Sequence, residues 1–91
     1  MSVAVAIFHP ALKKLVGDPE GLQLSGSTVG EALQDLTDRF PGAREMLFNK
    51  HGDLLRPVYV FVNQEGMGKA KLSRTLQQGD RLIIAVLASG G

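Results

Sequence analysis

Three apolar runs constrain the fold of this chain more than any other feature. They occupy residues 3–8, 58–62 and 82–87, and none of them contains a charged side chain. Both alternating sets of side chains are apolar in each run, which is typical of strands that are buried on both faces. Each run is also shorter than the stretch needed to cross a bilayer. The sequence therefore predicts a sheet whose two faces both need covering.

One amphipathic helix, at residues 28–40, is available to cover that sheet. Thr28 followed by Glu31 matches a capping box. We expect the Thr28 hydroxyl to accept an early helical N–H and Glu31 to accept the N–H of Thr28. Pro41-Gly42 then ends the helix. The apolar residues fall on one helix face: Val29, Leu33, Leu36 and Phe40.

The shorter segments are less regular. Glycine and proline punctuate residues 9–21, which favours a loop or turn region. Residues 22–24 are predicted to form a second strand, antiparallel to the first in a hairpin. Residues 43–48 favour a short helical turn, and residues 72–76 a short strand or a helical turn.

The order of these elements is strand, strand, helix, strand, irregular segment, strand. We predict an α+β fold of the β-grasp (ubiquitin-like) type. It has a mixed four- to five-stranded sheet with one main helix, at about residues 28–40, on one face. The first and last strands are expected to be adjacent and parallel at the centre, by analogy with that architecture.

A single helix leaves the second face of the sheet open. Alternation places one set of large apolar side chains there: Phe8, Tyr59, Phe61, Ile83 and Leu87. An exposed apolar patch of this kind often marks a protein–protein site. The alternative is that residues 41–54 fold over this face, with Met46, Leu47 and Phe48 as the covering side chains.

Composition excludes several classes of function. The chain has 91 residues, enough for one domain, with ten Lys and Arg against nine Asp and Glu. No basic block points to nucleic acid. There is no cysteine, so disulfides and a cysteine nucleophile are excluded. No secretory signal is visible, and we expect a soluble, cytoplasmic protein without membrane contact.

No constellation typical of an active site or a metal site is visible. His9 and His51 fall in predicted loops and have no ligand-spaced neighbour, so solvated side chains are expected. Gly66-Met67-Gly68-Lys69 lacks the upstream glycine of a phosphate loop and is followed by Ala70 instead of Ser or Thr. We predict no bound metal, no bound cofactor and no enzymatic activity of the chain itself.

The remaining candidate for chemistry is the segment Ala88-Ser89-Gly90-Gly91, predicted to be a flexible tail after a domain at residues 1–87. It could be an ordinary frayed end. It could also be a slim arm whose terminal carboxylate enters a narrow site on another protein, because glycine permits close backbone approach.

Over its whole length the chain resembles the ubiquitin-like sulfur carriers, that is, the MoaD, ThiS and CysO-like β-grasp proteins. The most specific segments are Val60-Phe61-Val62-Asn63, the stretch at residues 76–82, and the terminal Gly90-Gly91. Length and the segment at residues 56–60 are closest to the CysO type.

The resemblance implies a carrier instead of an enzyme. A ubiquitin-activating-enzyme-like adenylyltransferase would use ATP to adenylate the carboxylate of Gly91 and convert it to a thiocarboxylate. Gly90, Ser89 and Ala88 would give access. The sulfur would pass to a biosynthetic enzyme of the cysteine, molybdopterin or thiamine type. Two alternatives stay open: a ubiquitin-like modifier conjugated through Gly91, and a binding module that uses the apolar sheet face.

Overall fold

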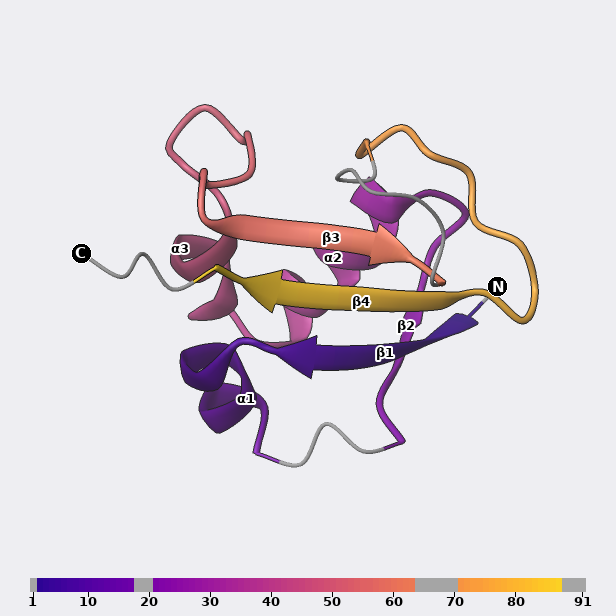
Figure 1. Ribbon diagram of the computed structural model, residues 1–91, viewed down its shortest axis with the longest axis horizontal. Coiled ribbons are helices and arrows are strands. Elements are labelled where there is room, and N and C mark those ends of the chain that lie inside the picture. Colours follow the sequence, from indigo (N-terminus) through magenta and orange to yellow (C-terminus); the bar gives the residue numbers. More distant parts are fainter. Residues whose placement is uncertain (1, 18–20, 64–70, 88–91) are drawn as a thin grey trace.

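A mixed sheet forms the frame of the protein (Figure 1). The computed structural model describes residues 2–17, 21–63 and 71–87. Within them the sheet has four strands in the order β2-β1-β4-β3. The strands are β1 (Ser2–Phe8), β2 (Gln23–Ser25), β3 (Val58–Val62) and β4 (Arg81–Val86). The predicted β-grasp class is confirmed.

The pairing at the centre of the sheet agrees with the expectation. β1 runs parallel to β4, with Val5 opposite Leu82. β3 is antiparallel to β4, with Val60 opposite Ile84. β2 is antiparallel to β1, as predicted, but α1 lies between the two strands in sequence, so they do not form a simple hairpin.

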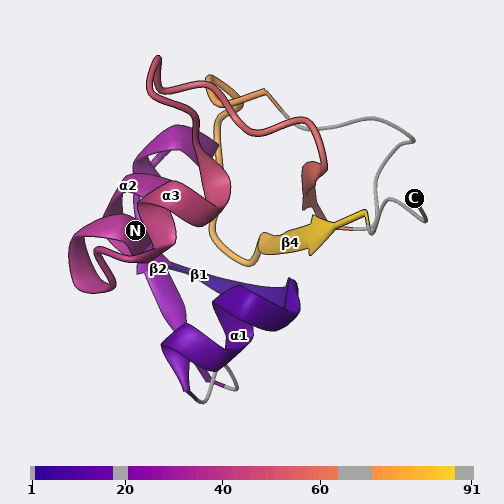
Figure 2. The same cartoon turned by 90° about the vertical axis from the view of Figure 1, so that its left-hand side faces the viewer.

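The longest helix, α2 (Val29–Arg39), covers one face of the sheet, and the short α3 (Ala43–Leu47) lies on the same side (Figure 2). The hydrophobic core fills the space between these two helices and the sheet. One set of side chains from each strand points into it, and every member is at most 7% exposed. The strand residues of the core are Val3, Val5, Ile7, Leu24, Val58, Val60, Val62, Leu82 and Ile84.

The capping box at the start of α2 is confirmed in one half and corrected in the other. The Thr28 hydroxyl accepts the N–H of Glu31 at 3.1 Å, as expected. Glu31 does not accept from Thr28. Its Oε1 instead accepts both the N–H and the hydroxyl of Ser27, each at 2.8 Å. A single carboxylate oxygen of Glu31 therefore accepts two hydrogen bonds from Ser27, the residue before the N-cap.

The prediction of a loop for residues 9–21 was wrong for its first half. Pro10–Val16 form helix α1, with Leu12 fully buried. Pro10 occupies the first helical position, where its missing N–H costs nothing. His9, expected to be solvated, is 8% exposed, and its Nδ1 accepts the N–H of Leu12 at 3.1 Å. A proline that ends a strand also begins a helix here.

Residues 71–76 form neither a full strand nor a helix. Thr75 makes a single antiparallel bridge with Thr28. The carbonyls of Arg74 and Leu72 accept the N–H groups of Val29 and Gly30, at 2.9 and 2.8 Å. These are N–H groups of the first helical turn, which have no partner inside the helix. The segment therefore completes the N-terminus of α2.

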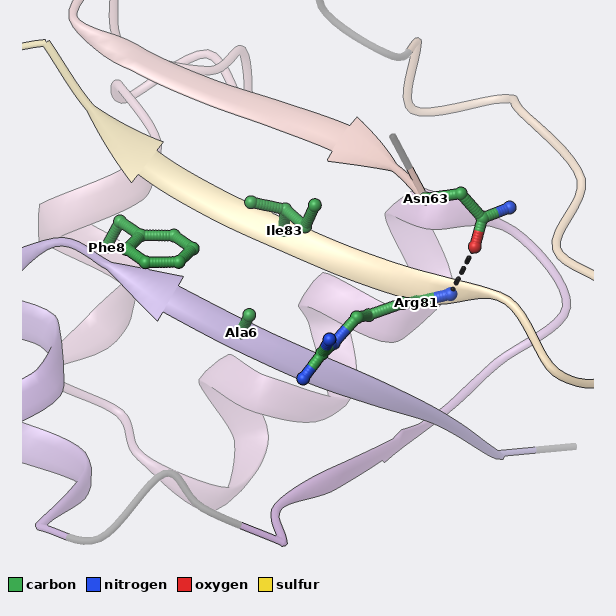
Figure 3. A pocket seen from close by; sticks show the side chains of 5 residues that line it. All are labelled: Ala6, Phe8, Asn63, Arg81 and Ile83. Carbon is green, nitrogen blue, oxygen red and sulfur yellow. Dashed lines mark hydrogen bonds between the residues drawn. The ribbon is translucent and has the colours of Figure 1, made fainter. Parts of the chain in front are cut away.

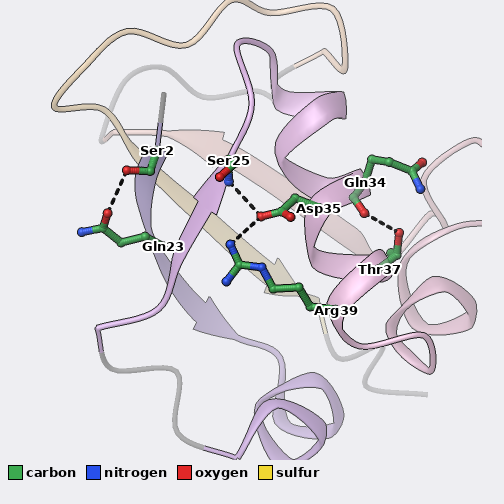
Figure 4. Close-up of polar contacts among 7 residues, drawn as sticks. All are labelled: Ser2, Gln23, Ser25, Gln34, Asp35, Thr37 and Arg39. Atoms are coloured by element: carbon green, nitrogen blue, oxygen red, sulfur yellow. Dashed lines mark hydrogen bonds and ion pairs between the residues drawn. The ribbon is translucent and has the colours of Figure 1, made fainter.

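Asp35 ties α2 to the edge strand β2 (Figure 4). Its carboxylate accepts the N–H of Ser25 at 2.9 Å and pairs with Arg39 at 2.8 Å. The hydrogen bond from Ser25 is the largest cause that lowers the pKa of Asp35.

Within the described part of the chain, no helix is long and apolar enough to cross a membrane.

Candidate partner-binding face

The face of the sheet opposite α2 is open across the described residues. Phe8 at the end of β1 is 64% exposed, and Leu87, directly after β4, is 62% exposed. Tyr59, Phe61 and Ile83 are partly buried on the same side. The structure therefore brings all five predicted apolar residues to one face. Whether a partner binds them stays a prediction.

The alternative, that residues 41–54 cover this face, was wrong. Ala43 and Leu47 of α3 are fully buried in the core on the α2 side. Met46 and Phe48 pack against the same core. The apolar side chains of this segment therefore pack in the core on the α2 side and do not cover the opposite face of the sheet.

Strand register arranges the open face in rows. Phe8 lies opposite Ala85, and Ala85 lies opposite Tyr59, so a small side chain separates two aromatic ones. The next row is Ala6, Ile83 and Phe61. The rings of Tyr59 and Phe61 stack with centroids 6.1 Å apart. Each row contains one small side chain, Ala85 in the first and Ala6 in the second, beside larger apolar ones.

Two concavities result. The larger, of about 360 Å³, is lined by Ala6, Phe8, Asn63, Arg81 and Ile83 (Figure 3). The smaller, of about 280 Å³, is lined by Tyr59, Phe61, Ala85, Val86 and Leu87. The sequence reasoning missed the alanines, Asn63 and Arg81. Period-two alternation already places Ala6, Ala85 and Arg81 on this face, but only large apolar side chains were counted.

Asn63 fixes the polar end of this face. Its side-chain Oδ1 accepts the N–H of Arg81 at 2.8 Å, and its Nδ2 donates to Asp80 at 3.0 Å. The second oxygen of Asp80 accepts the N–H of Gln77 at 2.8 Å. Both hydrogen bonds lower the pKa of Asp80, and the bond from Asn63 is the largest cause. They hold the turn that starts β4.

The opposite end of β4 leads toward the predicted reactive segment. The N–H of Leu87 donates to the carbonyl of Pro57 at 2.7 Å, so the chain stays attached to the sheet up to this residue. The predicted site residues Ala88, Ser89, Gly90 and Gly91 lie outside the described residues. The boundary at residues 87 and 88 likewise stays a prediction. What the structure provides is an anchored Leu87 beside the smaller concavity.

Within the described residues, no group of three or more His, Asp or Glu side chains is placed to hold a metal ion. His9 is used as a helix cap. Glu31, Asp35 and Asp80 all have lowered pKa values, and each has backbone hydrogen bonds as a cause. These carboxylates therefore serve the fold.

Three of the solved structures that share this architecture match the chain over nearly its whole length. SAMP1 from Haloferax volcanii matches with a TM-score of 0.83 at 26% identity, over 100% of both chains. The small archaeal modifier protein 1 (SAMP1) from Methanosarcina acetivorans matches at 0.78 and 29%, over 99% of this chain and 96% of that one. A chain of the Amycolatopsis orientalis BexX/CysO complex matches at 0.73 and 29%, over 97% and 100%.

No protein-family model matches the sequence, and no curated protein matches it. The fold and the structural neighbours define a ubiquitin-like β-grasp protein. Among such proteins, the chain is similar to the small carrier and modifier proteins represented by SAMP1 and CysO, which confirms the resemblance drawn from the sequence.

Proposed function

We propose that this protein is a sulfur carrier whose working group is the carboxylate of Gly91. One observation carries the proposal: Leu87 is anchored to Pro57 at the end of the central strand, beside an open apolar face. One partner could therefore hold the face and receive the following residues. Similarity to a chain of the BexX/CysO complex supports a carrier that works with a biosynthetic enzyme.

The chemistry has two steps on the activating partner. The Gly91 carboxylate attacks the α-phosphorus of ATP, pyrophosphate leaves, and an acyl-adenylate forms. Sulfide then attacks the acyl carbon, AMP leaves and a proton is lost, which gives a thiocarboxylate. This chain contributes binding and reach: four extended residues beyond Leu87 span roughly 13 Å. Gly90 and Gly91 carry no Cβ that would obstruct a narrow channel. The thiocarboxylate then donates its sulfur in cysteine, molybdopterin or thiamine-type biosynthesis.

The test is intact-mass measurement after incubation with the source organism's ubiquitin-activating-enzyme-like protein, ATP and sulfide. We expect the mass increase of one oxygen replaced by one sulfur. A variant that lacks Gly91 should show no increase and should unfold at the same urea concentration as the wild type. A wild-type mass that stays unchanged would contradict the proposal. Intact mass of protein from its native source also establishes whether the mature chain ends at Gly91.

A second candidate function is a protein modifier conjugated through Gly91 to lysines. The observation that favours it is the similarity to small archaeal modifier protein 1, at a TM-score of 0.78. Both functions begin with adenylation, so the first step does not separate them. High-mass conjugates that disappear when Gly91 is deleted would establish the modifier function. Their absence from cells that contain the thiocarboxylate would leave the carrier function alone.

A further inference from the structure

Arg81 is the one charged side chain on the outward side of the described strands. Parallel pairing puts it opposite Ala4, at the end of the sheet away from Leu87. Every other outward position on these strands is apolar or uncharged: Ser2, Ala4, Ala6, Phe8, Gln23, Ser25, Tyr59, Phe61, Ile83 and Ala85. The open face therefore carries a local positive charge at one defined point.

No carboxylate in the described part of the chain neutralises this charge. Asp80 precedes Arg81 directly, but its carboxylate accepts from Asn63 and from the N–H of Gln77 and forms no ion pair with Arg81. The ion pair between Arg39 and Asp35 connects two positions on α2 and does not involve Arg81. The guanidinium of Arg81 has five N–H donors and no acceptor. Its donors face outward beside an apolar surface.

The position of the guanidinium is tied to the larger concavity. Figure 3 shows the Arg81 side chain reaching from β4 across to β1, near Ala6. Phe8 and Ile83 form the apolar part of the same concavity. The main chain of Arg81 is fixed by two hydrogen bonds with Asn63, at 2.6 and 2.8 Å. The fixed main chain defines where the Arg81 side chain leaves the sheet.

We propose that Arg81 and this concavity form a specificity subsite for the activating enzyme, which would insert an apolar side chain flanked by a carboxylate. The inference rests on the proposed function and names what its partner must present. Charge complementarity favours a carboxylate, since Arg pairs with it through two parallel hydrogen bonds. The apolar part of the concavity selects the neighbouring side chain. Aromatic residues and arginine are also the residue types enriched at interface centres.

Kinetics of pyrophosphate release test the subsite, with the source organism's activating enzyme as the partner. Arg81→Glu should lower kcat/KM by about tenfold to a hundredfold, mainly through KM, because like charges meet at the interface. Arg81→Gln should lower kcat/KM by a smaller factor. Added salt should weaken the wild type more than Arg81→Gln, because salt screens the ion pair. A merely structural role of Arg81 would not produce this difference in salt dependence.

The matched control is Arg44→Glu, which makes the same change of charge at an exposed position of α3 on the other side of the sheet. It should leave KM unchanged. Urea unfolding of each variant establishes that it is folded. In Arg81→Lys, a zero-length carbodiimide should join the introduced amine to a partner carboxylate with loss of water. The cross-linked partner peptide should contain Asp or Glu beside an apolar residue.

The outcomes separate the two proposals. Wild-type turnover together with an unchanged KM for Arg81→Glu would overturn the subsite and leave the carrier function standing. Failure of the wild type itself to release pyrophosphate would overturn the carrier function, and the subsite with it. The carbodiimide joins an amine only to a carboxylate. If other lysines of Arg81→Lys are cross-linked to the partner and residue 81 is not, no partner carboxylate lies beside residue 81. That result would also overturn the subsite.

Discussion

Asn63 and Arg81 exchange two hydrogen bonds, but only one of them joins main chain to main chain. The N–H of Asn63 donates to the Arg81 carbonyl at 2.6 Å, and the N–H of Arg81 donates to the Asn63 side-chain Oδ1 at 2.8 Å. Asn63 has φ +59°, so its main chain turns away from β4. The side-chain oxygen takes the place that the carbonyl of a regular strand residue would fill.

Asn63→Ala should lower the free energy of unfolding by about 1–3 kcal/mol. It removes the side-chain bonds to Arg81 and Asp80 and leaves a Cβ-bearing residue without polar groups at positive φ. Asn63→Gly removes the same bonds but tolerates this φ, so it should cost less. Urea unfolding by circular dichroism measures both. Equal losses in the two variants would show that φ contributes nothing.

The two faces of the sheet should respond differently to truncation. Phe8→Ala removes an exposed ring and should change stability by less than about 0.5 kcal/mol, as surface substitutions usually do. It should nevertheless raise the KM of activation, because the ring lines the larger concavity.

The comparison variant is Leu33→Ala on the buried side of α2. It should cost about 2–5 kcal/mol through lost burial and a residual cavity. In conditions where this variant stays folded, its KM should match the wild type. A KM that changes in both variants, or in neither, would argue against the open face as the binding face.

Gly26 should not tolerate a side chain. A Cβ at this position would lie 2.6 Å from the main-chain nitrogen of Ala32 and 2.8 Å from Glu31, inside α2. Gly26→Ala should therefore destabilise the protein by about 1–3 kcal/mol, as overpacking does. At Gly42 the same Cβ would meet only Leu15, at 3.4 Å. Gly42→Ala is the control, and thermal unfolding of both variants should show a loss only at Gly26.

Stability should fall on acidification below about pH 4, where carboxyl groups of the unfolded chain take up protons. Folding lowers the pKa values of Glu31, Asp35 and Asp80, so the folded state resists protonation. Their contribution is present above the unfolded pKa and is lost as the pH falls through the folded pKa. Urea midpoints measured at neutral and acidic pH follow this loss.

Glu31→Gln tests the assignment to individual groups. The amide oxygen still accepts from Ser27, while the titrating carboxylate is gone. The decrease in stability between neutral and acidic pH should be smaller in this variant. A decrease as large as in the wild type would place the acid sensitivity elsewhere.

Local pattern was sufficient for most of the elements. Continuous apolar runs predicted β1, β3 and β4, and the Thr28–Glu31 spacing predicted where α2 begins. Local pattern failed to predict α1, because one residue there is compatible with two roles. Pro10 ends β1 and also starts α1, and choosing between a loop and a helix depended on the burial of Leu12 and the cap from His9. The burial of Leu12 is a tertiary contact that local sequence does not contain. The cap from His9 is local, but histidine is not among the usual N-cap residues.

The sequence by itself determined the periodicity, and hence which residues share a face of each strand. It also determined the slim glycine segment on which the proposed chemistry depends. Only the tertiary structure decided which face stays open, because α3 could have packed on either side, and Leu47 is buried on the side of α2. Only strand register placed Arg81, Ile83 and Phe8 around one concavity. Contacts between residues far apart in the chain decide these points, and a periodic pattern carries no information about them.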